Sequence, residues 1–119
     1  MKKDHCRDYV VNMFRFYAKV GEPDRAQIRN LKTQFSAAAI LDLYAVDNTL
    51  RVFSERERSD VIRAVREIYF VCPSRELRKN EISNRVTRFS VANNMDERSV
   101  YRRLELARRI CAEKRNLNI

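Results

Sequence analysis

The sequence is poor in the residues that tight turns require. Its 119 residues include one glycine and two prolines. Hairpin turns and glycine-rich phosphate loops both depend on such residues, because they place the backbone in sharp corners or at positive φ. This shortage argues against a mainly β fold and against a nucleotide-binding phosphate loop, and it favours a helical protein.

Long apolar runs are also missing. No stretch approaches the roughly 18 consecutive apolar residues that a membrane-spanning helix needs. The first ten residues, MKKDHCRDYV, lack the uninterrupted apolar segment of a signal peptide. We therefore expect a cytoplasmic protein with no membrane partner.

Side chains suited to metal, redox or catalytic chemistry are few. The three cysteines, Cys6, Cys72 and Cys111, are widely spaced and form no CxxC pair, which fits neither a disulfide framework nor a zinc site. We expect them to be reduced, partly buried thiols. The only histidine, His5, has no partner at metal-ligand spacing. Since no nucleophile with a base and no paired carboxylates can be assembled from spacing, we expect no metal, no cofactor and no enzymatic activity.

Positive charge is abundant and unevenly distributed. The chain carries 25 Lys and Arg against 16 Asp and Glu, a net charge of +9, with 45% hydrophobic residues, which is ordinary for one globular domain. Residues 1–60 hold 11 basic and 9 acidic groups, whereas residues 61–119 hold 14 and 7, and 12 of those 14 are Arg. Arginine can contact phosphates and recognise guanine edges. The C-terminal half is thus the candidate nucleic-acid-binding half, although a solvated basic surface would give the same charge.

Hydrophobic periodicity predicts an all-α bundle of about five helices. The first helix is expected from Asp4 to about Ala18, with Gly21 ending it. A second begins near Pro23, and either breaks at Asp47-Asn48 or runs on to Phe53. Sequence alone leaves both alternatives open.

A possible capping box marks the expected third helix. Ser54 followed by Glu57 has the spacing at which a serine and a glutamate satisfy the first backbone amides of a helix, which predicts a start at Glu55. The helix should end before Cys72-Pro73, because proline disfavours helical backbone in the residue that precedes it.

The last two predicted helices are joined by a short turn. Asn80 is expected to cap a helix with Ile82, Val86 and Phe89 on one face and Arg85 and Arg88 on the opposite face. The turn is Asn93-Asn94-Met95-Asp96, in which Asp96 is a strong N-cap, and the last helix runs from Glu97 to about Lys114. Its apolar stripe comprises Val100, Leu104, Ala107 and Cys111.

This arrangement is typical of a helix-turn-helix. In such units the second helix enters the DNA major groove with its N-terminal residues against base edges. The predicted outer face of the last helix carries Arg98, Arg102 and Arg109, and Tyr101 could stack on sugar or donate to phosphate, or simply be a half-buried aromatic. The sequence predicts a C-terminal DNA-reading helix.

The same residues resemble a known family. The stretch from Asn94 to Leu104, NMDERSVYRRL, continued by ELARR, resembles the helix-turn-helix of region 4 of bacterial sigma factors, and Ser54 to Phe70 resembles the family's upstream support helix. The likeness covers about residues 54–112, most closely to small sigma-like regulators of phages and prophages of Gram-positive bacteria. It implies DNA contacts by Arg98, Ser99, Arg102 and Arg103. Where the family has an apolar core residue, this chain has Asn93, which suggests a longer turn or a shifted register.

These observations predict two regions with different tasks. Residues 1–53 hold seven of the eleven aromatic residues and little net charge, so we expect them to dock on the third helix, with residues 35–53 as a homodimer surface. Residues 54–119 form the expected DNA-binding region, whose full candidate set is Arg85, Arg88, Arg98, Ser99, Tyr101, Arg102, Arg103 and Arg109.

The leading hypothesis is a sequence-specific regulator of bacterial or phage transcription that binds double-stranded DNA, with RNA polymerase as a candidate second partner of the N-terminal helices. Two alternatives remain at this point. One is the DNA-recognition subunit of a phage packaging assembly, and the other is a helical protein-interaction module that does not bind DNA.

Overall fold

The part of the chain that the computed structural model describes, residues 5–117, contains six α-helices and no strand. They are α1 (His5–Lys19), α2 (Arg25–Asn30), α3 (Ala37–Glu55), α4 (Ser59–Ile68), α5 (Glu81–Ala92) and α6 (Glu97–Lys114). The all-α prediction is confirmed, and α6 has the predicted bounds. The expected first residue of the first helix, Asp4, lies outside the described residues.

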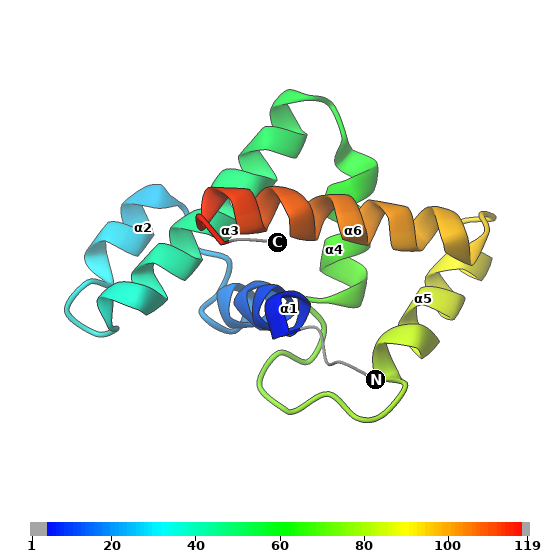
Figure 1. Ribbon diagram of the computed structural model, residues 1–119, viewed down its shortest axis with the longest axis horizontal. Coiled ribbons are helices and arrows are strands. Elements are labelled where there is room, and N and C mark those ends of the chain that lie inside the picture. Colours follow the sequence, from blue (N-terminus) through cyan, green and yellow to red (C-terminus); the bar gives the residue numbers. More distant parts are fainter. Residues whose placement is uncertain (1–4, 118–119) are drawn as a thin grey trace.

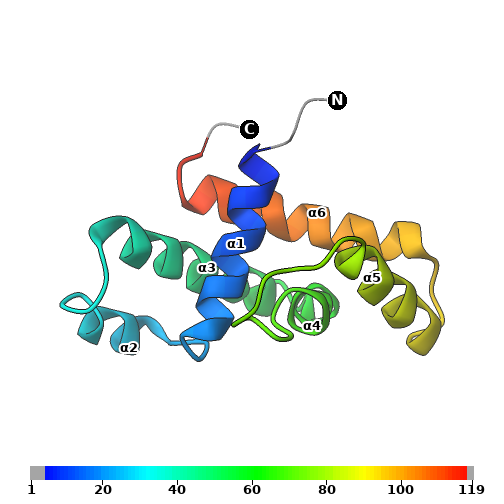
Figure 2. The same cartoon turned by 90° about the horizontal axis from the view of Figure 1, so that it is seen from below.

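Two long helices, α3 and α6, pack against each other at the centre of the molecule (Figure 1). Helix α1 packs on both of them, and α4 packs on α3, α5 and α6. Helix α2 packs on α3 at one end of the molecule, while α5 lies at the other end (Figure 2). Of the helices in residues 1–53, which were expected to dock on the third helix, α3 does pack on α4, whereas α1 and α2 pack mainly on α3. Phe14 of α1 also reaches Tyr69, just beyond α4, with ring centroids 5.5 Å apart.

One hydrophobic core runs through both halves of the chain. It includes Phe14 and Val46 from the N-terminal half and Ile68, Val86 and Leu104 from the C-terminal half, each 0–1% exposed. The boundary expected between residues 53 and 54 falls inside α3, which ends at Glu55. The predicted division into two regions is thus not a division of the fold.

The break in the N-terminal half lies at residues 31–36, where neither alternative from the sequence expected one. Ser36 starts α3, because its hydroxyl accepts a hydrogen bond from the amide of Ala39 (3.1 Å). The helix then continues through Asp47-Asn48 to Glu55. Pro23 precedes the N-cap residue of α2 instead of standing in its first turn.

The expected capping box at Ser54 is wrong. Ser54 and Glu55 form the last turn of α3, and α4 begins at Ser59. The amide of Arg58 donates to the carbonyl of Phe53 (2.7 Å), and that of Glu57 donates to Ser54 (3.2 Å), with Glu57 at a φ of 57°. This pair of bonds is the Schellman pattern that closes a helix C-terminus. Phe53 is 1% exposed. Because its side chain is buried in the core, α3 continues to Glu55 and includes Ser54, the residue that had suggested the start of a new helix.

The three cysteines are free, as expected, but they differ in exposure. Cys111 is buried, Cys6 is half-buried and Cys72 is exposed, so the expected partial burial is wrong for Cys72. Among residues 5–117, no helix is both long and apolar enough to cross a membrane.

Candidate nucleic-acid interface

The turn between α5 and α6 is short and closed at both ends. The amide of Met95 donates to Ser90 (3.0 Å), and Asn94 adopts a φ of 51°, which ends α5 in a second Schellman-type turn. The Asp96 carboxylate then accepts the amide of Ser99 (2.7 Å) and starts α6. This bond also holds the pKa of Asp96 below its usual value. The predicted cap is confirmed.

Asn93 explains how the turn manages without the apolar residue of the resembled family. Its side-chain amide donates to the carbonyl of Phe89 (2.9 Å), in the last turn of α5. That carbonyl also accepts the backbone amide of Asn93 (3.0 Å). The polar side chain therefore completes the end of the helix instead of filling the core.

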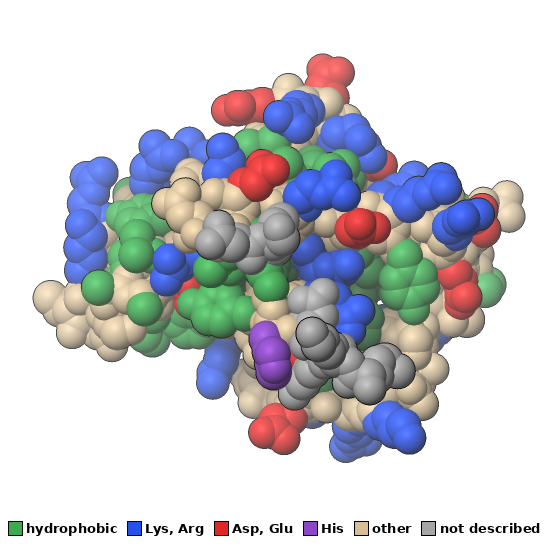
Figure 3. Space-filling view, viewed as in Figure 1, with side chains coloured by type: hydrophobic (Ala, Val, Ile, Leu, Met, Phe, Trp, Pro, Cys, Tyr) green, Lys and Arg blue, Asp and Glu red, His purple; other side chains and the backbone are tan. Residues whose placement is uncertain are grey.

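The apolar stripe of α6 fixes which face of the helix points outward. Val100, Leu104, Ala107 and Cys111 are 0–1% exposed, as predicted. Arg98, Arg102 and Arg109 are exposed on the other side, separated by four and seven residues, so they lie along one line of the helix. Figure 3 shows Lys and Arg side chains along the face that α6 crosses, with fewer carboxylates among them.

The arginines of this line differ in their pairing. The guanidinium of Arg109 lies 3.5 Å from the carboxylate of Glu105. Within residues 5–117, Arg98 and Arg102 make no ion pair. An unpaired, exposed guanidinium keeps its charge and its five N–H donors for an external ligand.

Arg103 and Ser99, two of the residues that the resemblance assigned to DNA, also make hydrogen bonds inside the protein. The Arg103 guanidinium donates to Asp60 of α4 (3.0 Å) and to the carbonyl of Ser99 (3.0 Å). The amide of Ser99 belongs to the cap described above. Both side chains are only half-exposed.

Arg85 was expected on the exposed face of α5 beside Arg88, and for Arg85 this is wrong. Its side chain is 7% exposed and donates to the carbonyl of Ile68 (2.7 Å) and to the Glu81 carboxylate. The carbonyl of Ile68 lies at the C-terminus of α4, where no helical amide is available to bond it, so a buried donor is required. Arg75 also pairs with Glu81 (2.8 Å) and is the main cause that lowers the pKa of Glu81 to about 2. Arg88 is exposed, as predicted.

Arg15 is an interior residue that the sequence analysis did not single out. It is 6% exposed, and its guanidinium donates to the carbonyls of Val71 (3.4 Å), Cys72 (3.0 Å) and Arg75 (2.5 Å). It thereby fixes the segment that leads from α4 to α5. A single cation among the apolar residues of α1, MFRFY, was the available signal for it.

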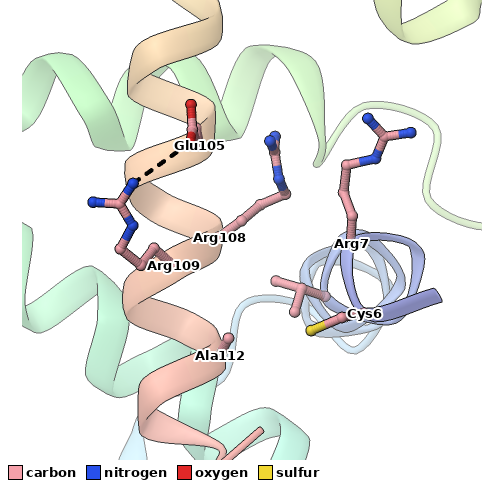
Figure 4. A pocket seen from close by; sticks show the side chains of 7 residues that line it. Cys6, Arg7, Glu105, Arg108, Arg109 and Ala112 are labelled. Atoms are coloured by element: carbon pink, nitrogen blue, oxygen red, sulfur yellow. Dashed lines mark hydrogen bonds and ion pairs between the residues drawn. The ribbon is translucent and has the colours of Figure 1, made fainter. Parts of the chain in front are cut away.

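A cleft lined by arginines lies beside the contact between α1 and α6 (Figure 4). Cys6 and Arg7 of α1 and Glu105, Arg108 and Arg109 of α6 line it. In Figure 4 Arg108 lies on the side of α6 that faces α1, whereas the guanidinium of Arg109 points to the other side of the helix, toward Glu105. A neighbouring hollow, bounded by α1, α5 and α6, shares Arg7 and Arg108 and is also lined by Tyr101, which is 43% exposed. No sequence pattern pointed to Arg7 and Arg108 together, because they lie at opposite ends of the chain.

Comparisons with protein-family models, with curated proteins and with solved structures give no match for this chain. The resemblance to sigma-factor region 4 therefore stays a prediction from the residues quoted for it.

Proposed function

We propose that this protein binds double-stranded DNA through α5 and α6 and regulates transcription, with α6 in the major groove. The observation that carries the proposal is the line of Arg98, Arg102 and Arg109 on a helix whose opposite face is fixed in the core. The short turn before α6, capped by Asp96, exposes the N-terminal end of that helix. Sequence-reading helices contact base edges with this end.

The dimensions of α6 suit this role. Arg98 and Arg109 are eleven residues apart, or about 16 Å at 1.5 Å per residue. The major groove is about 12 Å wide, so a helix inserted at Arg98 and Arg102 brings Arg109 to the level of the bordering phosphates. In this arrangement Arg98 and Arg102 read bases, while Arg109 and Arg88 contact phosphates. Tyr101 lies beside this line and can donate to the backbone.

The proposal extends to the partners. A role at a phage or prophage promoter would bring the surface of α1 and α2 next to RNA polymerase.

A palindromic DNA site would require a homodimer. Most of the apolar side chains of residues 35–53 are buried inside the monomer. Leu41, which is 52% exposed, is the large apolar residue of that segment most available for contact with a second copy of the chain. Light scattering of the purified protein distinguishes monomer from dimer. We propose a binding protein, not an enzyme.

The test is a selection of duplexes from a random pool, followed by fluorescence anisotropy with the selected duplex and with a random one at several salt concentrations. We expect affinity to fall steeply with salt and the selected duplex to bind at least 1,000-fold more tightly than the random duplex, as is typical of specific readers at about 10³ or more.

Variants separate base reading from charge. Arg102→Ala should reduce discrimination among duplexes, since one bidentate contact to guanine contributes about 1–3 kcal/mol. Arg63→Ala is the matched control, because Arg63 is an exposed arginine of α4 that pairs with Glu67 (2.8 Å). Equal losses on all duplexes for Arg102→Ala would assign Arg102 to the backbone, and a wild-type protein without duplex preference would refute sequence-specific binding.

A further inference from the structure

The cleft between α1 and α6 has the size of a small anion site. Its volume is about 190 Å³, which leaves room for a small anion such as phosphate. Three arginines, Arg7, Arg108 and Arg109, line it against the single carboxylate of Glu105. Figure 4 shows the side chains of Arg7 and Arg108, from different helices, extending in the same direction.

The charge of Arg108 is not neutralised inside the described part of the chain. Its Nη1 donates to the hydroxyl of Tyr69 (2.8 Å), and no carboxylate of residues 5–117 pairs with it. Burial raises the pKa of Tyr69, so this partner is an uncharged phenol at neutral pH. The remaining N–H groups of Arg108 make no hydrogen bond within the described residues and are available to a ligand.

Two guanidinium groups that line the same cleft fit an oxyanion that accepts several hydrogen bonds. Arginine forms paired N–H···O bonds with phosphate and carboxylate groups alike. The position of the cleft favours phosphate. Arg109 belongs both to the cleft and to the line of Arg98 and Arg102, and it lies about 16 Å along α6 from Arg98, where the backbone bordering an occupied major groove would pass.

We propose that the cleft between α1 and α6 binds a phosphate of the DNA backbone through Arg7 and Arg108. This inference rests on the proposed function, because it places the duplex on α6. It makes α1 part of the DNA-binding surface, with Arg7 on one side of the phosphate and Arg108 on the other. The N-terminal half then sets the position of α6 along the groove, in addition to its part in the core.

The experiment compares Arg7→Gln, Arg108→Gln and the double variant with wild type in duplex binding from 50 to 300 mM salt. Arg63→Gln, which removes the same charge from the exposed face of α4, is the matched control. Each cleft variant should weaken binding roughly tenfold and equally on selected and random duplexes, because phosphates carry no sequence information. The slope of log K against log salt should become less negative by about 0.9 for the lost contact, whereas the control keeps the wild-type slope.

The double variant tests whether both arginines contact the same phosphate. If they do, its loss of affinity is smaller than the product of the two single losses. Circular dichroism melts check that each variant is folded; Arg7→Gln tests the cleft without removing the hydrogen bond from Arg108 to Tyr69.

Several outcomes separate this inference from the proposed function. If the wild-type protein binds duplex DNA and both single variants keep its slope of log K against log salt, the cleft proposal is overturned and the proposed function is unaffected. Binding without duplex preference refutes the proposed function, while reduced slopes in the same data still support the cleft. If the wild type binds no duplex at 50 mM salt, both proposals fail. Saturable binding of inorganic phosphate at Arg108, followed by NMR of arginine side chains, with unchanged duplex slopes would assign the cleft to a free phosphate and overturn the DNA assignment.

Discussion

The guanidinium of Arg103 in α6 lies 3.0 Å from the carboxylate of Asp60, in the first turn of α4. Asp60 also accepts from Arg58 (2.9 Å), and this bond is the main cause that lowers its pKa to about 2. An arginine that the resemblance assigned to DNA thus fixes the end of α6 against α4. This contact holds α6 against α4 close to Arg98 and Arg102, the two arginines that we propose to read bases.

Replacing Asp60 by Asn should reduce the free energy of unfolding by about 0.5–1 kcal/mol at pH 7, a value kept small because the pair is partly exposed to solvent. The folded-state pKa of about 2 lies below the ordinary 3.8, so the contribution is present above about pH 4 and is lost as pH falls toward 2. Urea unfolding at pH 7, 4 and 2.5 measures this. A difference between wild type and variant that persists unchanged at pH 2.5 would contradict the assignment. Glu67→Gln, which breaks the exposed pair with Arg63, is the control.

Arg15→Met should lower the free energy of unfolding by about 2–4 kcal/mol. Methionine fills much of the same volume but leaves the carbonyls of Val71, Cys72 and Arg75 without their buried donor. Urea unfolding gives the stability, and limited proteolysis should show faster cleavage between α4 and α5. Arg29→Met, at an exposed position of α2, controls for the loss of one positive charge. Equal stability of the two variants would show that Arg15 does not hold the segment.

Asp96→Ala should lower the melting temperature, because the amide of Ser99 loses its acceptor at the start of α6. Asp96→Asn keeps an acceptor oxygen and should retain most of the stability. Thermal unfolding of the three proteins at pH 7 distinguishes them. If the Ala and Asn variants melt at the same temperature, the side-chain hydrogen bond contributes nothing.

The fragment 54–119 should not fold by itself. The removed residues include Val10, Phe14, Leu43 and Val46, which are 0–1% exposed, and α3 forms one side of the site where α6 packs. Circular dichroism and size-exclusion chromatography of the fragment are expected to show lost helicity or aggregation. A soluble, cooperatively unfolding fragment would show instead that the C-terminal helices are an independent domain.

Local chemistry in the sequence was sufficient to predict the last helix. Asp96 and the asparagines before it specify a turn and a cap through bonds to residues at most five positions away. The apolar spacing of Val100, Leu104 and Ala107 specifies the buried face, because a helix repeats every 3.6 residues. The same local reading was wrong at Ser54, where a helix end and a helix start use similar polar residues and only the burial of Phe53 distinguishes them.

The sequence by itself therefore determined the helical class, the bounds of α6 and the exposure of Arg98, Arg102 and Arg109, since each follows from spacing within one segment. The tertiary structure alone decided which other arginines are used inside the protein. Arg15, Arg85 and Arg103 bond to groups 17 to 60 residues away, and the cleft between Arg7 and Arg108 exists only because α1 packs on α6. A positively charged side chain is attracted equally by a phosphate, a carboxylate or a carbonyl, so its role depends on which of these the fold brings within reach.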